Sequence, residues 1–99
     1  MKRVKASDFP ALKEVFSGYL HEDFVKEYGS ATAALRSFEA DADDDEVDRF
    51  RAEVQRFLEM TAPLEFAKVR ALLTQLGSRW HPASRKSMAT VLTGEAAAH

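Results

Sequence analysis

The chain has 99 residues, of which 45% are apolar and 30% are charged, and its formal net charge is −2. This composition is typical of one soluble globular domain with a modest core and excludes a disordered chain, and the absence of cysteine excludes disulfides and thiolate metal sites. No apolar run approaches the ~20 residues that cross a bilayer, and no apolar segment follows the basic N-terminus as in a signal peptide, so we expect a cytoplasmic protein that does not bind membrane.

The N-terminal part of the chain predicts a helix over residues 9–20. Asp8 is the expected N-cap, and Pro10 falls in the first turn, where its missing N–H costs nothing. The apolar face of this helix recurs at helical spacing: Leu12, Val15, Phe16 and Tyr19. An elbow over residues 21–29 follows, with one extra helical turn at 24–28.

Two more helices are predicted in the middle of the chain. Ser30 is the expected N-cap of the second, whose apolar face is Ala31, Ala34, Leu35 and Phe38. The third helix has the strongest signal, a single apolar stripe of Val47, Phe50, Val54, Phe57 and Leu58. We place five charged residues of this helix on its solvent face: Arg49, Arg51, Glu53, Arg56 and Glu59.

The C-terminal part predicts a fourth helix from Pro63 to Leu76, with Phe66, Val69, Leu72, Leu73 and Leu76 facing inward. Gly77 follows as its C′ residue, and residues 79–82 form a non-helical connector. A last helix over 84–92 buries Met88, Val91 and Leu92. Because no stretch alternates with period two, we expect a single all-α domain over residues 1–99, a compact bundle of four to five short helices, with 1–7 and 94–99 frayed.

Acidic residues are concentrated between the second and third helices. Residues 39–48 hold seven acids and no base: Glu39, Asp41, Asp43, Asp44, Asp45, Glu46 and Asp48. An EF-hand loop begun at Asp41 would need glycine at its sixth position and glutamate at its twelfth, where the chain has Glu46 and Ala52. We therefore expect no calcium loop, and no metal or cofactor is indicated elsewhere.

Two interpretations of this acidic segment stay open. Acids at the start of a helix are stabilising by ~0.3–1 kcal/mol each, which explains a cap and one or two neighbours. Seven acids exceed that need because they repel one another, so the segment also fits a surface for a basic protein partner. Direct binding of nucleic acid is disfavoured, since it needs a concentrated basic face.

The elbow carries a cluster that a generic helical domain does not need: Tyr19, Leu20, His21, Glu22, Asp23 and Phe24, then Tyr28, Gly29 and Ser30. A metal or catalytic site is not indicated, because residue 25 is valine where a helical two-histidine motif would need histidine. We expect His21 or Asp23 to bond backbone groups freed at the end of the first helix, while Tyr19, Phe24 and Tyr28 seal the turn. Contact with a partner is the alternative.

This cluster resembles the immunity proteins of bacterial contact-dependent growth inhibition systems. Members of this kind carry Tyr-Phe-His-Gln-Asp-Trp followed by Tyr-Gly-Ser, and here Leu20, Glu22 and Phe24 differ while keeping size or polarity. A later pattern of the family is matched by Leu76, Gly77, Trp80 and Pro82, so the resemblance covers about residues 9–82. It implies a protein that is not an enzyme and binds a cognate toxin domain, often a nuclease, stoichiometrically.

The resemblance and the charge distribution together give candidate toxin-binding residues: Glu39, Asp41, Asp43, Asp44, Asp45 and Trp80. Acids would steer the protein to a basic substrate groove, and tryptophan is enriched among binding hot spots, although Trp80 fits a core-capping role equally well. The motif residues are expected to hold the fold, because relatives that share them neutralise different toxins: Tyr19, His21, Asp23, Phe24, Tyr28, Gly29 and Ser30. The alternative function is a helical adaptor or scaffold that self-associates through an exposed apolar strip.

Overall fold

The computed structural model describes residues 4–94, which form a short 3-10 helix and six α-helices and contain no β-strand. The elements are η1 (Ala6–Asp8), α1 (Pro10–Tyr19), α2 (Phe24–Tyr28), α3 (Ala31–Asp41), α4 (Asp44–Thr61), α5 (Phe66–Gln75) and α6 (Arg85–Thr93). The all-α prediction is confirmed. The structure has one helix more than the five predicted, and this additional helix is α2, the extra turn predicted in the elbow. The fraying expected at the ends falls largely on residues 1–3 and 95–99, which lie outside the described residues.

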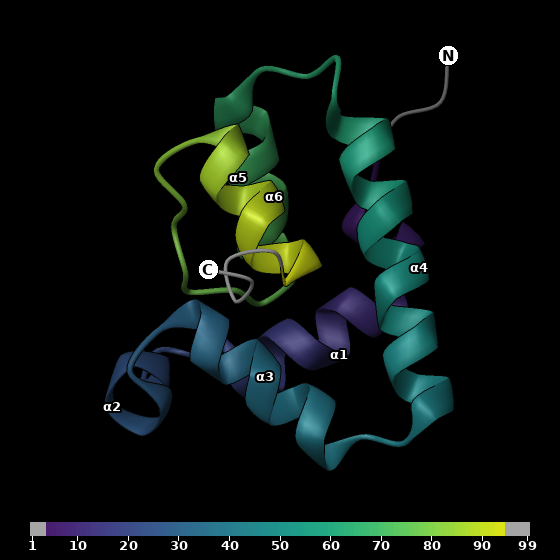
Figure 1. Ribbon diagram of the computed structural model, residues 1–99. Helices are drawn as coiled ribbons and strands as arrows, with labels where there is room; N and C mark the ends of the chain where they lie inside the picture. The colour runs from purple at the N-terminus through teal and green to yellow at the C-terminus, as the bar shows by residue number, and fades with distance from the viewer. Residues whose placement is uncertain (1–3, 95–99) are drawn as a thin grey trace.

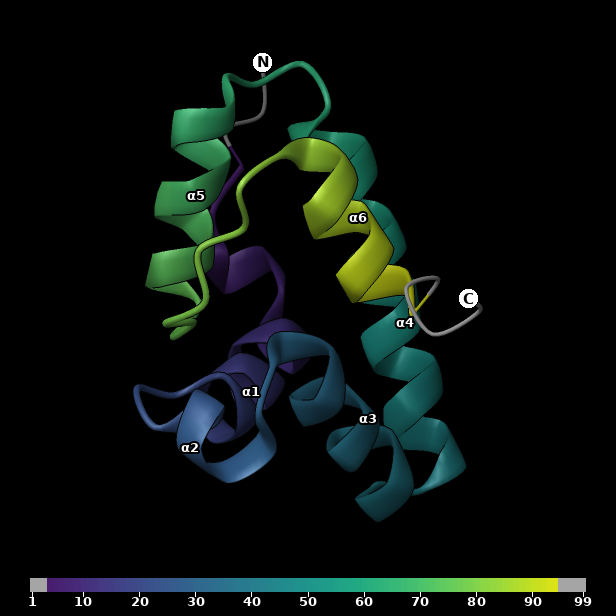
Figure 2. The same cartoon turned by 60° about the vertical axis from the view of Figure 1, so that its left-hand side comes forward.

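The helices form two levels joined by α4. Figures 1 and 2 show α1, α2 and α3 together at one end, α5 and α6 at the other, and α4 running past both. Helix α1 packs against α3 and α4, whereas α6 packs against α3 and α4 from the other side. Because α4 has 18 residues, it is about 27 Å long at ~1.5 Å per residue and is long enough to reach both levels of the fold.

The core is built around phenylalanine side chains from α1, α3 and α4 and from Phe9, which directly precedes α1. Phe9 and Phe57 meet edge to face with ring centroids 5.3 Å apart, and Phe50 lies 6.4 Å from Phe16 and 5.1 Å from Phe38. These residues are at most 5% exposed. The apolar stripes predicted on the first three helices are therefore the surfaces that pack together. Apolar residues spaced in this way share one face only in a helix, so burying them favours helices over strands.

Helix caps that depend on the sequence alone are where the sequence places them. The Ser30 hydroxyl accepts a hydrogen bond from the Ala33 N–H at 3.1 Å, and the Asp43 carboxylate accepts one from the Glu46 N–H at 2.8 Å. Gly29 has a φ of +88°, a left-handed conformation that ends α2 and that glycine adopts without strain. Each of these caps is formed by groups at the same helix end, which explains why local sequence predicts it.

The N-terminus of α1 is different, and two predictions about it are wrong. Asp8 is not the N-cap: it ends η1, and Phe9 occupies the cap position without a side-chain hydrogen bond. Glu53 does not face solvent: it is 6% exposed, and its Oε1 accepts hydrogen bonds from the Ala11 N–H at 2.9 Å and the Leu12 N–H at 3.1 Å. Helix α4 thus supplies the cap of α1, since Pro10 has no N–H and the next two donors need an acceptor.

Arg56 strengthens the same junction from the next turn of α4. Its Nη2 donates to the Asp8 carbonyl oxygen at 2.6 Å, and its guanidinium lies 5.3 Å from the centroid of the Phe9 ring. The cation is therefore held both by a hydrogen bond and by the aromatic face. Glu53 and Arg56 together fix where α1 starts and how it crosses α4.

Helix α5 begins later than predicted. Pro63 belongs to the turn after α4, in which the Leu64 N–H donates to the Thr61 carbonyl at 3.0 Å, and the extended backbone of Glu65 delays the helix to Phe66. Arg85 of α6 closes this turn, because its Nη1 donates to the Thr61 carbonyl at 3.1 Å. The Thr61 carbonyl, freed at the end of α4, thus takes its partners from the turn and from α6.

The connector after α5 completes the C-terminal end of α1. The Arg79 N–H donates to the Leu20 carbonyl at 2.7 Å, so a backbone group from residues 76–84 caps α1 there. His21, one of the two side chains expected to bond backbone groups here, bonds the Asp23 N–H and not a carbonyl of α1. Gly77 has a φ of +94°, and a Cβ at this position would lie 2.5 Å from the Ser17 hydroxyl, so glycine is required by both conformation and space.

Candidate functional site

Acidic side chains from the α3–α4 junction divide into those that support the fold and those that do not. Glu39 is half-buried and pairs with Arg51 at 3.0 Å, and Asp43 caps α4. Asp44 and Asp45 are exposed in the first turn of α4, and neither side chain has a hydrogen bond or ion pair with another described residue. We call the exposed carboxylates here the acidic edge: Asp41, Asp43, Asp44, Asp45, Glu46 and Asp48.

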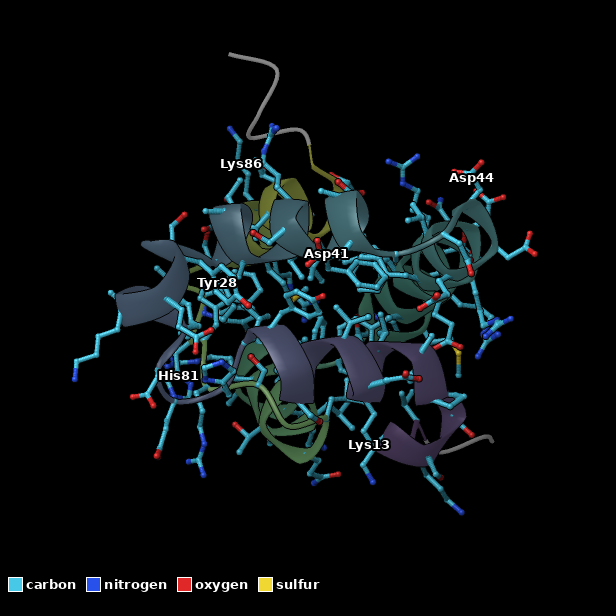
Figure 3. All side chains as sticks on the ribbon, turned by 90° about the horizontal axis from the view of Figure 1, so that it is seen from below. Lys13, Tyr28, Asp41, Asp44, His81 and Lys86 are labelled. Carbon is cyan, nitrogen blue, oxygen red and sulfur yellow. The ribbon has the colours of Figure 1, made fainter. Side chains whose placement is uncertain are left out.

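A groove of about 360 Å³ lies between α1 and the α3–α4 junction, next to the acidic edge. Its apolar lining comes from Ala11, Val15, Phe38 and Ala42. Its polar lining comes from Glu14, Tyr19, Asp41, Glu46 and Arg49. Figure 3 shows Asp41 above the seam between α1 and α3, with Asp44 further along, towards the start of α4. The groove therefore joins carboxylates from two parts of the chain to an apolar wall.

Tyr19 ties the groove to the elbow. Its hydroxyl donates to Asp41 Oδ2 at 3.3 Å, and its ring lies 5.6 Å from that of Phe38 and 5.9 Å from that of Tyr28. Burial raises the pKa of the Tyr19 phenol above its ordinary 10.0, and the charge of Asp41 raises it further. Burial also raises the pKa of Tyr28, with the charge of Glu27 as the second cause. Both phenols are thus held in the neutral, hydrogen-bond-donating form.

His21 is occupied by the elbow itself. Its Nδ1 accepts a hydrogen bond from the Asp23 N–H at 3.1 Å, and its Nε2 lies 3.4 Å from Glu27 Oε2. The Asp23 carboxylate is exposed and does not pair with the imidazole. Among residues 4–94, no group of three or more histidine, aspartate or glutamate side chains is arranged to hold a metal ion, and none of the described helices is long and apolar enough to cross a bilayer.

A comparison with protein families shows which family this chain belongs to. The sequence pattern of the CdiI immunity protein family matches residues 8–92, most of the chain. The chain belongs to the CdiI immunity protein family. Neither a curated protein nor a solved structure matches it in the corresponding searches. The resemblance seen in the sequence is thereby confirmed at the level of the family.

In this CdiI immunity protein, the predicted binding residues do not form one site. Glu39, Asp41, Asp43, Asp44 and Asp45 share the α3–α4 junction. Trp80 lies in the connector between α5 and α6, where it is half-buried and packed on the core, and its backbone N–H donates to the Ser78 hydroxyl at 3.1 Å. Figure 3 shows its neighbour His81 and Asp44 at opposite ends of the view.

Sequence reasoning missed three charged residues that line the groove: Glu14, Glu46 and Arg49. Glu46 was counted in the acidic segment but was not chosen as a contact, and Glu14 was not considered because it precedes Asp41 by most of two helices. One signal was available. Glu14 and Val15 are adjacent on the first helix, so a groove that exposes part of one face there would place this acid at its rim.

Proposed function

We propose that this CdiI immunity protein neutralises its cognate toxin in the cytoplasm by binding the toxin domain one to one through the acidic edge. The observation that carries this proposal is the exposure of Asp44 and Asp45 at the start of α4, without a side-chain partner among the described residues. Like charges held together at a surface repel one another, and an opposite charge supplied by a partner relieves this repulsion.

A nuclease is the toxin class that suits such a surface. Its substrate is a polyanion, so its substrate groove must present lysine and arginine side chains to the phosphates. A surface that mimics the charge of the substrate would occupy that groove and accelerate association by electrostatic steering. Inhibition would then follow from occupancy alone, without any reaction catalysed by the immunity protein.

We assign the elbow motif a structural role within this proposal. Phe24 is 8% exposed, the Tyr19 and Tyr28 rings are in contact, and the imidazole of His21 bonds inside the elbow. These contacts use the aromatic and imidazole groups to hold α2 against the end of α1. Glu22 and Asp23 remain exposed and provide a natural comparison for the acids of the acidic edge.

The scaffold alternative depends on an exposed apolar strip. Within residues 4–94, the large apolar side chain that is mainly exposed is Val25 on α2, at 60%. A single valine offers far less apolar area than a self-associating surface requires. No observation on the described residues favours this alternative over the immunity function.

The proposal is tested by titration calorimetry against the C-terminal domain of the toxin encoded beside this protein. The wild type is expected to bind one to one with a Kd of roughly nanomolar order. The double variant Asp44→Asn/Asp45→Asn should bind more weakly, and its Kd should depend less steeply on salt. A toxin domain that is folded and active but does not bind the wild type would refute the proposal.

A matched control separates the acidic edge from net charge. Glu22→Gln/Asp23→Asn removes the same charge from exposed positions on the elbow. It should leave the affinity close to that of the wild type. If this control weakens binding more than the Asp44/Asp45 pair does, the elbow and not the acidic edge contacts the toxin.

A further inference from the structure

We infer that the groove between α1 and the α3–α4 junction receives an arginine side chain of the toxin. This inference rests on the proposed function, and it goes further by naming a socket and the group that fills it. The acidic edge alone describes a charged surface, whereas the groove has a defined lining, an apolar wall and a volume of about 360 Å³.

The charge of the groove is unbalanced. Glu14, Asp41 and Glu46 line it with three carboxylates, against the single guanidinium of Arg49. None of the three carboxylates forms an ion pair with another described residue, although Asp41 accepts the Tyr19 hydroxyl. An added cation would therefore meet acids that have charge left to neutralise.

The lining of the groove favours a long organic cation over a metal ion. Among the described residues, no group of three or more carboxylate or imidazole side chains is arranged to hold a metal ion. The volume of about 360 Å³ admits one long side chain with its stem. The half-buried Ala11 and Ala42 provide apolar surface for that stem.

Arginine fits this lining better than lysine. Its planar guanidinium binds a carboxylate through two parallel hydrogen bonds, and the groove presents carboxylates from α1, α3 and α4. A lysine ammonium is a compact, strongly hydrated charge that would meet these carboxylates without this bidentate geometry. The toxin group that this groove selects is therefore an arginine.

Glu14 is the residue that distinguishes a socket from steering by the acidic edge. It lies on α1, outside the acidic segment 39–48, so steering by the acidic edge does not require it. A socket requires it as much as Glu46, because the two line the groove from α1 and α4. Groove acids should act mainly on the dissociation rate, whereas edge acids outside the groove should act mainly on the association rate.

The experiment measures both rate constants for the toxin domain on immobilised protein. Glu14→Gln and Glu46→Gln should each raise the dissociation rate by at least about tenfold. Asp45→Asn should lower the association rate a few-fold and leave dissociation unchanged, and Glu59→Gln, an exposed position later on α4, should change neither. Thermal unfolding monitored by circular dichroism verifies that all four variants are folded.

If the toxin binds and the two groove variants behave like Asp45→Asn, the socket is refuted while the proposed function stands. If the wild type does not bind the toxin, the proposed function fails and a second measurement decides on the groove. Nα-acetyl-arginine amide is then titrated into the 15N-labelled protein, with the uncharged citrulline analogue as control. Shifts of the Val15, Tyr19 and Asp41 amides with arginine alone support the socket, and equal responses to both compounds overturn it.

Discussion

Two groups of acids on the same helix behave in opposite ways. Glu53, in the middle of α4, is buried and holds the first N–H groups of α1, whereas Asp44 and Asp45, at the start of α4, are exposed and have no side-chain partner among the described residues. All three are carboxylates on one element. The residue type is the same, so what decides whether an acid supports the fold or is free for a partner is the position of hydrogen-bond donors on another helix.

The physical reason is the cost of desolvation. A buried carboxylate is tolerated only where hydrogen bonds replace the water it loses, and the α1 N-terminus supplies two of them together with the positive end of the helix dipole. At the surface, Asp44 and Asp45 keep their water and gain little from the α4 dipole. They can therefore be neutralised, or recruited by a toxin, without loss of the fold.

The strongest test of this contrast is Glu53→Ala. It leaves the Ala11 and Leu12 N–H groups without an acceptor, so we expect the free energy of unfolding to fall by about 3 kcal/mol in urea titrations. Glu59→Ala, an exposed acid of the same helix, is the control and should change it by less than about 0.5 kcal/mol. Equal effects of the two substitutions would mean that the cap of α1 does not depend on α4.

A smaller effect distinguishes two neighbours within the acidic edge. Asp43→Ala removes the hydrogen bond to the Glu46 N–H and should destabilise the protein by about 1 kcal/mol. Asp45→Ala removes no such bond, and its stability should stay within about 0.5 kcal/mol of the wild type. Urea titration of both variants tests this. A larger loss of stability for Asp45→Ala than for Asp43→Ala would contradict the assignment of Asp43 as the cap of α4.

The smallest expected effect concerns the tyrosine at the groove. Tyr28→Phe leaves Tyr19 as the only tyrosine, so its ionisation can be followed by ultraviolet absorbance. Its pKa should lie above 10.0 and fall towards that value in Asp41→Asn. Because the folded state holds this proton more tightly than the unfolded state, its contribution to stability is complete below pH 10.0 and is lost as pH rises through the raised pKa. An unchanged pKa in Asp41→Asn would separate Tyr19 from the acidic edge.

Local signals predicted most of the helices, and contacts between helices account for the errors. The caps at Ser30 and Asp43 and the glycine stop at Gly29 depend on nearest neighbours, so the sequence contains all of their information. Glu53 was assigned to solvent because acids are seldom buried, although its spacing from Phe50 and Phe57 places it on the core side of α4. The delayed start of α5 also follows from a turn that Arg85, far along the chain, helps to close.

The candidate site shows the same division. The helical class, the acidic segment and the family resemblance follow from composition, spacing and motif alone. Contacts between helices set which acids are already used by the fold, place Trp80 apart from them, and bring Glu14 into the same groove as Asp41 and Glu46. A groove is formed by the crossing of α1 with the α3–α4 junction, and the geometry of a crossing is set by packed side chains from distant parts of the chain.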